Sequence, residues 1–190
     1  MTREPARSEL PVGVRVRALD MHPDDRGVLA EIFREEWETG IEPVQWNAVR
    51  SEANTLRGVH VHVAHDDYLV VLAGRATIGL RDLRRGSPTE GLATTVDLGG
   101  DRMAAITTPS GVAHGFHFAE PTLYVYATST YWDPADEIGC MWDDPELEIP
   151  WSPGSPIISE RDASAPPLSD LVAELEPHQP IGGAAPPPAS

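Results

Sequence analysis

The chain has 190 residues, of which 30 are acidic and 14 basic, so its formal net charge is −16. This length allows one domain with a real core, and the acidity argues against nucleic acid or an anionic membrane as a partner. All the basic residues are arginine, which excludes a catalytic lysine.

The expected location is the cytoplasm. No apolar run approaches the roughly 18–20 residues that a membrane span needs. The first residues carry charges and lack the apolar core of a secretory signal. Cys140 is the only cysteine, so no internal disulfide can form.

Short runs typical of β-strands recur along the chain, rich in Val, Ile, Thr, Tyr and Trp and separated by Gly, Pro, Asp and Ser. One helix is predicted over 167–175, where leucine and valine follow helical spacing. Many short strands without a long helix predict a sandwich or a barrel. The predicted strands cover residues 12–19, 44–51, 68–74, 75–83, 92–98 and 122–132.

The predicted organisation is a single barrel domain over residues 1–163 followed by a short helix over 164–176. The last stretch, 177–190, is rich in Pro, Ala and Gly. Such a composition predicts a disordered tail.

The stretch RGVHVHVAHDDYLVVLAG, residues 57–74, carries three histidines and two aspartates. His60 and His62 are two residues apart, so an extended strand presents both on one face. Asp67 follows, and a later PSGVAHGF segment ends its Pro-x-Gly-x-x-His spacing at His114. This combination resembles the two signature motifs of the cupin superfamily, which implies an all-β jelly-roll barrel with a polar site inside.

A closer resemblance covers roughly residues 24–166. Six segments appear in an order similar to that of the dTDP-4-dehydrorhamnose 3,5-epimerase family, a cupin branch of deoxysugar biosynthesis. The segments are DDRGVLAEIF, VQWNAVRSEANTLRGVH, RRGSPTEG, TPSGVAHGF, YATSTYWDPADEIGCMWDDPELEIPW and ISERDASAP. The resemblance implies a homodimeric isomerase that moves protons next to the C4 ketone of a nucleotide-linked sugar and uses no metal.

The resemblance also implies roles for individual residues. His60 matches the family's catalytic base, Asp162 the carboxylate that holds this base, and Tyr126 the acid on the opposite side of the sugar. Arginine suits phosphate binding because its planar fork pairs with two oxygens. The residues implied to bind the substrate are Arg26, Glu31, Gln45, Asn47, Arg57, His114 and Trp132, with Arg26 coming partly from the second subunit.

Two departures from the family pattern concern the polar site. Asp67 stands where the family has the lysine that stabilises the enolate, and His62 stands where the family usually has glutamine. Both changes restore residue types of metal-binding cupins. Imidazoles and a carboxylate suit Fe, Mn, Ni, Co or Zn without selecting one, so His60, His62, Asp67 and His114 form a candidate metal site.

Three functions therefore stay open from the sequence: a deoxysugar epimerase, a metal-dependent cupin enzyme acting on another small molecule, and a binding protein without catalysis. Some candidate residues have plainer explanations. Tyr126 could be a core tyrosine of a strand, and Arg26 could belong to a turn. His65 is expected in an exposed loop, and Cys140 is expected to be a small buried residue.

Overall fold

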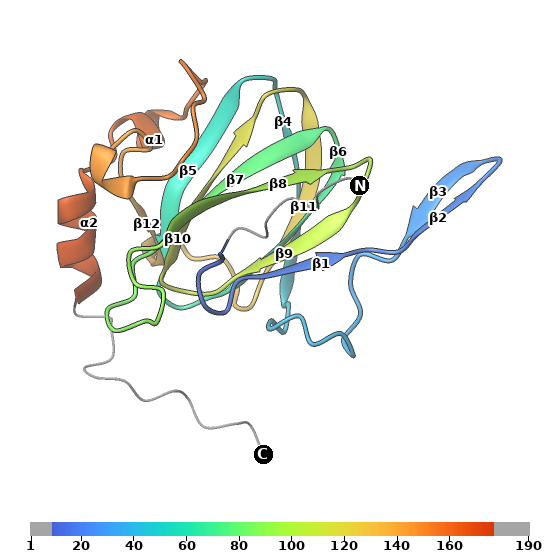
Figure 1. Ribbon diagram of the computed structural model, residues 1–190, viewed down its shortest axis with the longest axis horizontal. Helices are drawn as coiled ribbons and strands as arrows, with labels where there is room; N and C mark the ends of the chain where they lie inside the picture. Colours follow the sequence, from blue (N-terminus) through green and yellow to red (C-terminus); the bar gives the residue numbers. More distant parts are fainter. Residues whose placement is uncertain (1–8, 177–190) are drawn as a thin grey trace, which may run out of the picture.

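The computed structural model describes residues 9–176, so the predicted tail lies outside the described residues. Two five-stranded antiparallel sheets face each other in a jelly-roll barrel (Figure 1). The first sheet has the order β1-β9-β6-β11-β4, and the second has the order β12-β5-β10-β7-β8. A separate hairpin, β2-β3, projects away from the barrel. The all-β fold class predicted from the motifs is confirmed.

The first sheet contains β1 (Arg15–Ala18), β4 (Gln45–Ser51), β6 (Asp67–Ala73), β9 (Ala104–Thr108) and β11 (Thr122–Thr128). The second contains β5 (Thr55–His62), β7 (Arg75–Asp82), β8 (Ala93–Gly99), β10 (Val112–Phe118) and β12 (Glu137–Gly139). The hairpin pairs β2 (Met21–Asp24) with β3 (Gly27–Ala30). The helices are η1 (Pro134–Asp136), η2 (Pro145–Leu147), α1 (Glu160–Ala163) and α2 (Leu168–Leu175). No helix of residues 9–176 has the length and apolar character to cross a membrane.

Most predicted strands match within one residue at each end, and the predicted helix matches α2. Two strands are shorter than predicted. The strand predicted from residue 12 begins at Arg15, because Gly13 adopts a φ of 87° in a turn that Val14 closes onto Pro11. The strand predicted to residue 132 ends at Thr128, where the chain leaves the sheet and runs toward η1.

Alternation along the strands of the second sheet separates an inner and an outer face. On β5, Val59 and Val61 are fully buried on the outer face, in a cluster with Leu171 of α2. His60 and His62 face the barrel interior, where a separate apolar cluster that includes Phe118 packs between the sheets. The C-terminal segment therefore forms an outer layer on the second sheet (Figure 1).

This outer layer needs space on the sheet, and two glycines supply it. Gly79 of β7 and Gly115 of β10 are direct cross-strand partners, and Trp151 packs over both. A Cβ atom on Gly79 would lie 2.7 Å from Trp151 Cζ3, and one on Gly115 would lie 2.8 Å from Cη2. Neither position tolerates a side chain without movement of the tryptophan.

The substitution Gly79→Ala should lower the free energy of unfolding by about 1–3 kcal/mol, the usual cost of overpacking. Urea unfolding followed by tryptophan fluorescence measures this change. Thr95→Ala is the control, because Thr95 is the partner of Gly79 on β8 and its substitution adds no atom. Equal unfolding midpoints for Gly79→Ala and the control would contradict the tight packing of Trp151.

Candidate functional site in the barrel cavity

A cavity of about 660 Å³ opens between the two sheets, a volume typical of small-molecule sites. Both sheets and the segment that leads into α1 contribute to its wall. Apolar and aromatic side chains form one part of the lining, and titratable groups form another. The polar and aromatic lining residues include Arg57, His60, His62, His65, Asp67, His114, Phe116, Tyr124, Tyr126, Trp132, Glu137, Arg161 and Asp162.

The first polar group is a carboxylate–imidazole pair. His60 Nε2 lies 2.8 Å from Asp162 Oδ1. Asp162 is buried, and Ser159 caps the first turn of α1 by accepting its backbone N–H. Burial raises the pKa of Asp162, but the hydrogen bond and charge attraction of His60 outweigh this effect and hold the pKa below its usual value. Asp162 is therefore ionised at neutral pH, and its carboxylate accepts a hydrogen bond from Nε2 when this nitrogen carries a proton.

Gly58 allows this pair to form. Its φ of 114° lies in a region that residues with a Cβ rarely adopt. A Cβ on Gly58 would also lie 2.8 Å from Gly115 Cα on the neighbouring strand. The bare backbone lets the Gly58 N–H approach Asp162 Oδ2 to 3.4 Å. The glycine of the RGVH segment thus fixes β5 close to the carboxylate.

Arg161 and Glu137 border the same imidazole, and the sequence reasoning did not identify either of them. Arg161 Nη2 lies 2.8 Å from His60 Nε2, and Glu137 Oε1 lies 3.5 Å from Nδ1. The two residues also form an ion pair with each other at 2.8 Å. Nε2 thus lies between the Asp162 carboxylate, which accepts hydrogen bonds, and the Arg161 guanidinium, which donates them. Nε2 binds Asp162 when it carries a hydrogen and Arg161 when it carries a lone pair. The available sequence signal for Arg161 was its position directly before Asp162.

Tyr126 lines the cavity from β11, on the opposite sheet. Burial raises its pKa, and the negative charges of Asp67 and Glu137 raise it further. The phenol therefore holds its proton at neutral pH. The cavity combines a basic imidazole on one sheet with a proton donor on the other.

A second polar group surrounds Asp67, the first residue of β6. His62 Nε2 lies 3.1 Å and His114 Nε2 lies 3.2 Å from Asp67 Oδ2. Burial raises the pKa of Asp67, but the hydrogen bonds and charges of His114 and His62 dominate and hold it well below its usual value. The same carboxylate raises the pKa of His62 against the effect of burial. The His62 ring and the Asp67 carboxylate therefore stabilise each other's charged forms.

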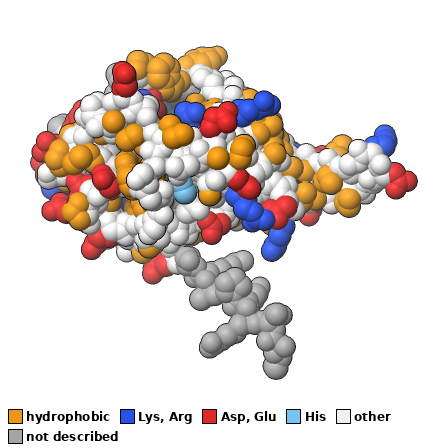
Figure 2. All heavy atoms as spheres, turned by 90° about the horizontal axis from the view of Figure 1, so that it is seen from above, with side chains coloured by type: hydrophobic (Ala, Val, Ile, Leu, Met, Phe, Trp, Pro, Cys, Tyr) orange, Lys and Arg blue, Asp and Glu red, His pale blue; other side chains and the backbone are white. Residues whose placement is uncertain are grey.

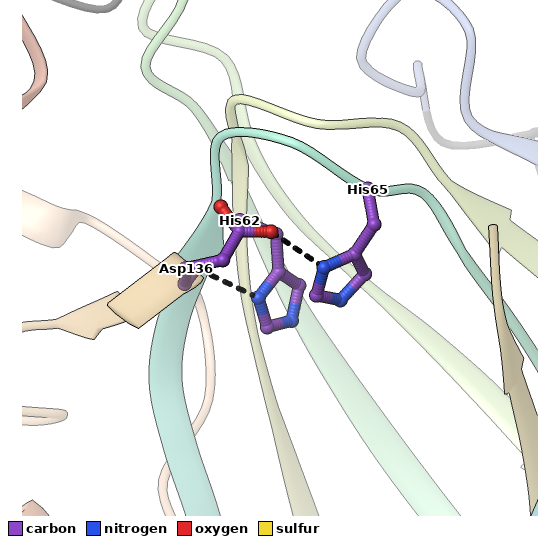
Figure 3. A group of neighbouring side chains, drawn as sticks. All are labelled: His62, His65 and Asp136. Atoms are coloured by element: carbon purple, nitrogen blue, oxygen red, sulfur yellow. Dashed lines mark hydrogen bonds and ion pairs between the residues drawn. The ribbon is translucent and has the colours of Figure 1, made fainter. Parts of the chain in front are cut away.

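His65 belongs to this second group, and its expected place in an exposed loop is wrong. Its side chain is 1% exposed, and its Nδ1 lies 2.6 Å from Asp136 Oδ2 (Figure 3). The ring also stacks on His62 with centroids 4.0 Å apart. Asp136 comes from η1, more than 70 residues later in the chain, so local sequence gave no sign of the contact.

The structure divides the four residues predicted to hold a metal. Ligand atoms of His62, Asp67 and His114 all lie within 4.8 Å of one another, and His60 is outside this group. His60 instead points its Nε2 at Asp162 and Arg161. The predicted four-ligand set is corrected to a three-residue group next to a separate carboxylate–imidazole pair.

The residues expected to bind substrate lie in three places. Arg57, His114 and Trp132 line the cavity. On β4, the Gln45 side chain donates a hydrogen bond to the Asn47 side chain. The Gln45 side-chain oxygen also accepts a hydrogen bond from the backbone N–H of Trp132 at 3.0 Å.

Arg26 and Glu31 are not among the residues that line the cavity. The Arg26 side chain is 89% exposed at the turn of the β2-β3 hairpin and pairs with Asp24, while Glu31 pairs with Arg34. The hairpin, which contains Arg26 at its turn, projects away from the barrel (Figure 1). Their predicted contact with the substrate stays a prediction.

Comparison with known proteins gives a consistent result. A family profile described as dTDP-4-dehydrorhamnose 3,5-epimerase matches residues 10–170. The chain is 35% identical over 159 residues to the dTDP-4-dehydrorhamnose 3,5-epimerase of Pseudomonas aeruginosa, covering 77% of this chain and 86% of that protein. It is 32% identical over 147 residues to the spore coat polysaccharide biosynthesis protein SpsL of Bacillus subtilis, covering 74% and 95%.

Solved structures are similar over nearly the whole chain. The dTDP-6-deoxy-D-glucose-3,5-epimerase of Legionella pneumophila, in complex with dTDP-4-keto-L-rhamnose, has a TM-score of 0.80 at 29% identity and covers 90% of this chain and 94% of its own. The 3'-monoepimerase ChmJ of Streptomyces bikiniensis, in complex with dTDP-quinovose, has a TM-score of 0.79 at 29% identity, with 90% of each chain covered.

The geometry of the first polar group predicts how Asp162→Asn changes stability. A lowered folded-state pKa means that the ionised carboxylate stabilises the fold above the unfolded pKa, near 3.8, and that this stabilisation is lost as the pH falls further. At neutral pH, Asp162→Asn should lower the free energy of unfolding by about 1–3 kcal/mol, and the difference should shrink toward about pH 3. Urea unfolding across this pH range measures it.

The exposed Asp143→Asn is the control for a change of net charge. A difference between Asp162→Asn and the original chain that stays constant down to the lowest pH would contradict an ionised Asp162 bound to His60.

Proposed function

Because the chain belongs to the dTDP-4-dehydrorhamnose 3,5-epimerase family, we propose that it inverts one or two carbon centres of a dTDP-linked 4-keto-6-deoxysugar. The observation that carries the proposal is the shared cavity of the His60–Asp162 pair and Tyr126. Inversion next to a ketone needs a base on one face of the sugar and an acid on the other. This cavity has one such group on each of its two sheets.

The proposed reaction begins at His60. With Nε2–H bound to Asp162, the Nδ1 atom carries the lone pair and takes the proton from the carbon beside the C4 ketone. The C–H electron pair moves into an enolate, with the charge on the C4 oxygen. Both ring nitrogens of the resulting imidazolium then face carboxylates, Asp162 at 2.8 Å and Glu137 at 3.5 Å, and these two negative charges stabilise it against the Arg161 guanidinium 2.8 Å from Nε2.

Tyr126 completes the proposed inversion. Its phenol holds a proton because its pKa is raised, and it delivers that proton to the opposite face of the enolate carbon. The ketone re-forms. The phenolate of Tyr126 then takes a proton from solvent and the His60 imidazolium releases one to solvent, which restores both groups. The family epimerases need no cofactor for this chemistry, and the transfer between His60 and Tyr126 requires none. The candidate metal ligands His62, Asp67 and His114 are a separate proposal.

The diphosphate of a nucleotide sugar is negatively charged, so its binding needs basic side chains, and this acidic chain has few of them. Arg57 supplies positive charge in the cavity wall. We propose that Arg26 supplies it from a second copy of the chain in a homodimer, because the hairpin places it far from its own cavity. Exposed Val28 and Leu29 on β3 support a contact of this hairpin with another surface (Figure 2). A cytoplasmic location is proposed with it, because a charged nucleotide sugar does not cross a bilayer unaided.

Two substitutions separate the proposed base from the proposed acid. His60→Asn should lower both solvent deuterium exchange next to the ketone and inversion by about 10²–10⁴-fold, the usual contribution of one proton-transfer group. Tyr126→Phe should lower inversion by a similar factor while exchange at the abstracted position persists. Deuterium incorporation by NMR and product analysis measure the two rates on dTDP-4-keto-6-deoxysugars.

Tyr131→Phe and His117→Asn are the matched controls. Tyr131 is exposed, and His117 is on the same strand as His114 but does not line the cavity. Ligand binding without exchange across the sugar panel would indicate a binding protein instead of an epimerase. Unchanged inversion in His60→Asn would remove His60 as the base.

Arg26→Ala should raise the KM for a dTDP-sugar by roughly 10-fold or more, because a charged hydrogen bond contributes about 1.5–3 kcal/mol. The exposed Arg75→Ala, whose guanidinium pairs with Asp101, is the control. A mixture of the Arg26→Ala chain with the His60→Asn chain tests which subunit supplies Arg26 to each site. If Arg26 acts across the dimer, one site of each mixed dimer is intact and activity returns; if it acts within its own chain, mixing restores nothing.

A further inference from the structure

Two of the three histidines around Asp67, His62 and His114, share a hydrogen-bonding arrangement. His114 Nδ1 lies 3.1 Å from the carbonyl oxygen of Val112, and His62 Nδ1 lies 3.4 Å from the carbonyl oxygen of Asp136. A carbonyl oxygen only accepts hydrogen bonds, so each Nδ1 carries a hydrogen. In the neutral ring this leaves the lone pair on Nε2.

Both Nε2 atoms then point at one carboxylate oxygen. Their distances to Asp67 Oδ2 are 3.1 Å and 3.2 Å. Two imidazole lone pairs and a buried carboxylate oxygen repel one another unless positive charge lies between them. Positive charge between these groups, either protons on the rings or one metal ion bound by all three groups, removes this repulsion.

We propose that His62, Asp67 and His114 bind one divalent transition-metal ion. Bond lengths of about 2.0–2.1 Å to nitrogen and oxygen put neighbouring ligand atoms about 3 Å apart in tetrahedral or octahedral geometry. The two distances to Asp67 Oδ2 match this spacing, and the three ligand atoms lie within 4.8 Å of one another. Two imidazoles and one carboxylate are a donor set that iron, zinc and their neighbours share.

His65 and Asp136 would support these ligands without binding the ion themselves. Asp136 Oδ1 accepts the backbone N–H groups of Val63 and Ala64, and Oδ2 binds His65 Nδ1 (Figure 3). Both carboxylate oxygens of Asp136 are thus already engaged in hydrogen bonds. His65 stacks on the His62 ring, and its Nε2 lies 3.6 Å from the second oxygen of Asp67. Such outer contacts orient metal ligands in proteins.

The ion would have coordination positions open to the cavity, because only three protein groups hold it and all three line the cavity wall. A cation there would also supply positive charge for the developing enolate oxygen, at the sequence position where the family has its lysine. This role rests on the proposed epimerase function. Binding of the ion does not, so the two can fail separately.

The test measures metal on the full chain, purified without a histidine tag. Mass spectrometry should find close to one equivalent of a transition metal in the purified protein, or Zn²⁺ should bind the chelator-treated protein with one-to-one stoichiometry by calorimetry. Asp67→Asn and His114→Ala should each weaken Zn²⁺ binding by at least about 100-fold, and His65→Ala by about 10–100-fold. Circular dichroism checks that each variant is folded.

Two further histidine variants are the controls. His117→Ala removes a histidine outside the group, and His60→Ala removes the one bound to Asp162; both should keep one equivalent of Zn²⁺ with unchanged affinity. No metal in the purified protein and no Zn²⁺ binding would overturn the proposal in favour of protonated rings. Loss of the ion in His60→Ala would overturn this ligand set. Because no substrate is present, none of these results depends on the epimerase assay.

Discussion

The hydrogen bond between His60 and Asp162 joins two parts of the chain that are 102 residues apart. Its formation requires the C-terminal segment to return across the outer face of the second sheet, where Trp151 fits over two glycines and α2 covers Val59 and Val61. Packing on the outside of the barrel thus fixes a polar contact on the inside. The catalytic geometry proposed for this cavity depends on that return together with the bare backbone of Gly58 in β5.

The charged groups in and next to the cavity form two separate sets. Asp162 and Glu137 share His60 and Arg161, while Asp67 and Asp136 share His62, His65 and His114. Buried carboxylates persist only with such partners, because an unpaired buried charge is costly. The division gives one imidazole, His60, a role distinct from the other three.

Period-two alternation correctly predicted that His60 and His62 share a face of one strand, and the motif spacing predicted the barrel. The same local reasoning failed for groups completed by distant segments. His65 is buried because Asp136 arrives from η1 to bind it, and His60 is turned away from the predicted metal group by Asp162 and Arg161. Strand alternation says which face a side chain occupies, but not which distant residue meets it there. The predicted roles of Arg26, Gln45 and Asn47 stay predictions.

The proposed contact of the β2-β3 hairpin with a second copy of the chain has a consequence for how the protein responds to ionic strength. In the proposed dimer, two copies that each carry a formal charge of −16 must approach, and dissolved salt screens their repulsion. The same screening weakens the attraction of the arginines for a diphosphate. If the proposed dimer and arginine contacts form, subunit association and nucleotide affinity depend on salt in opposite senses, and catalysis at low protein concentration passes through an optimum in ionic strength.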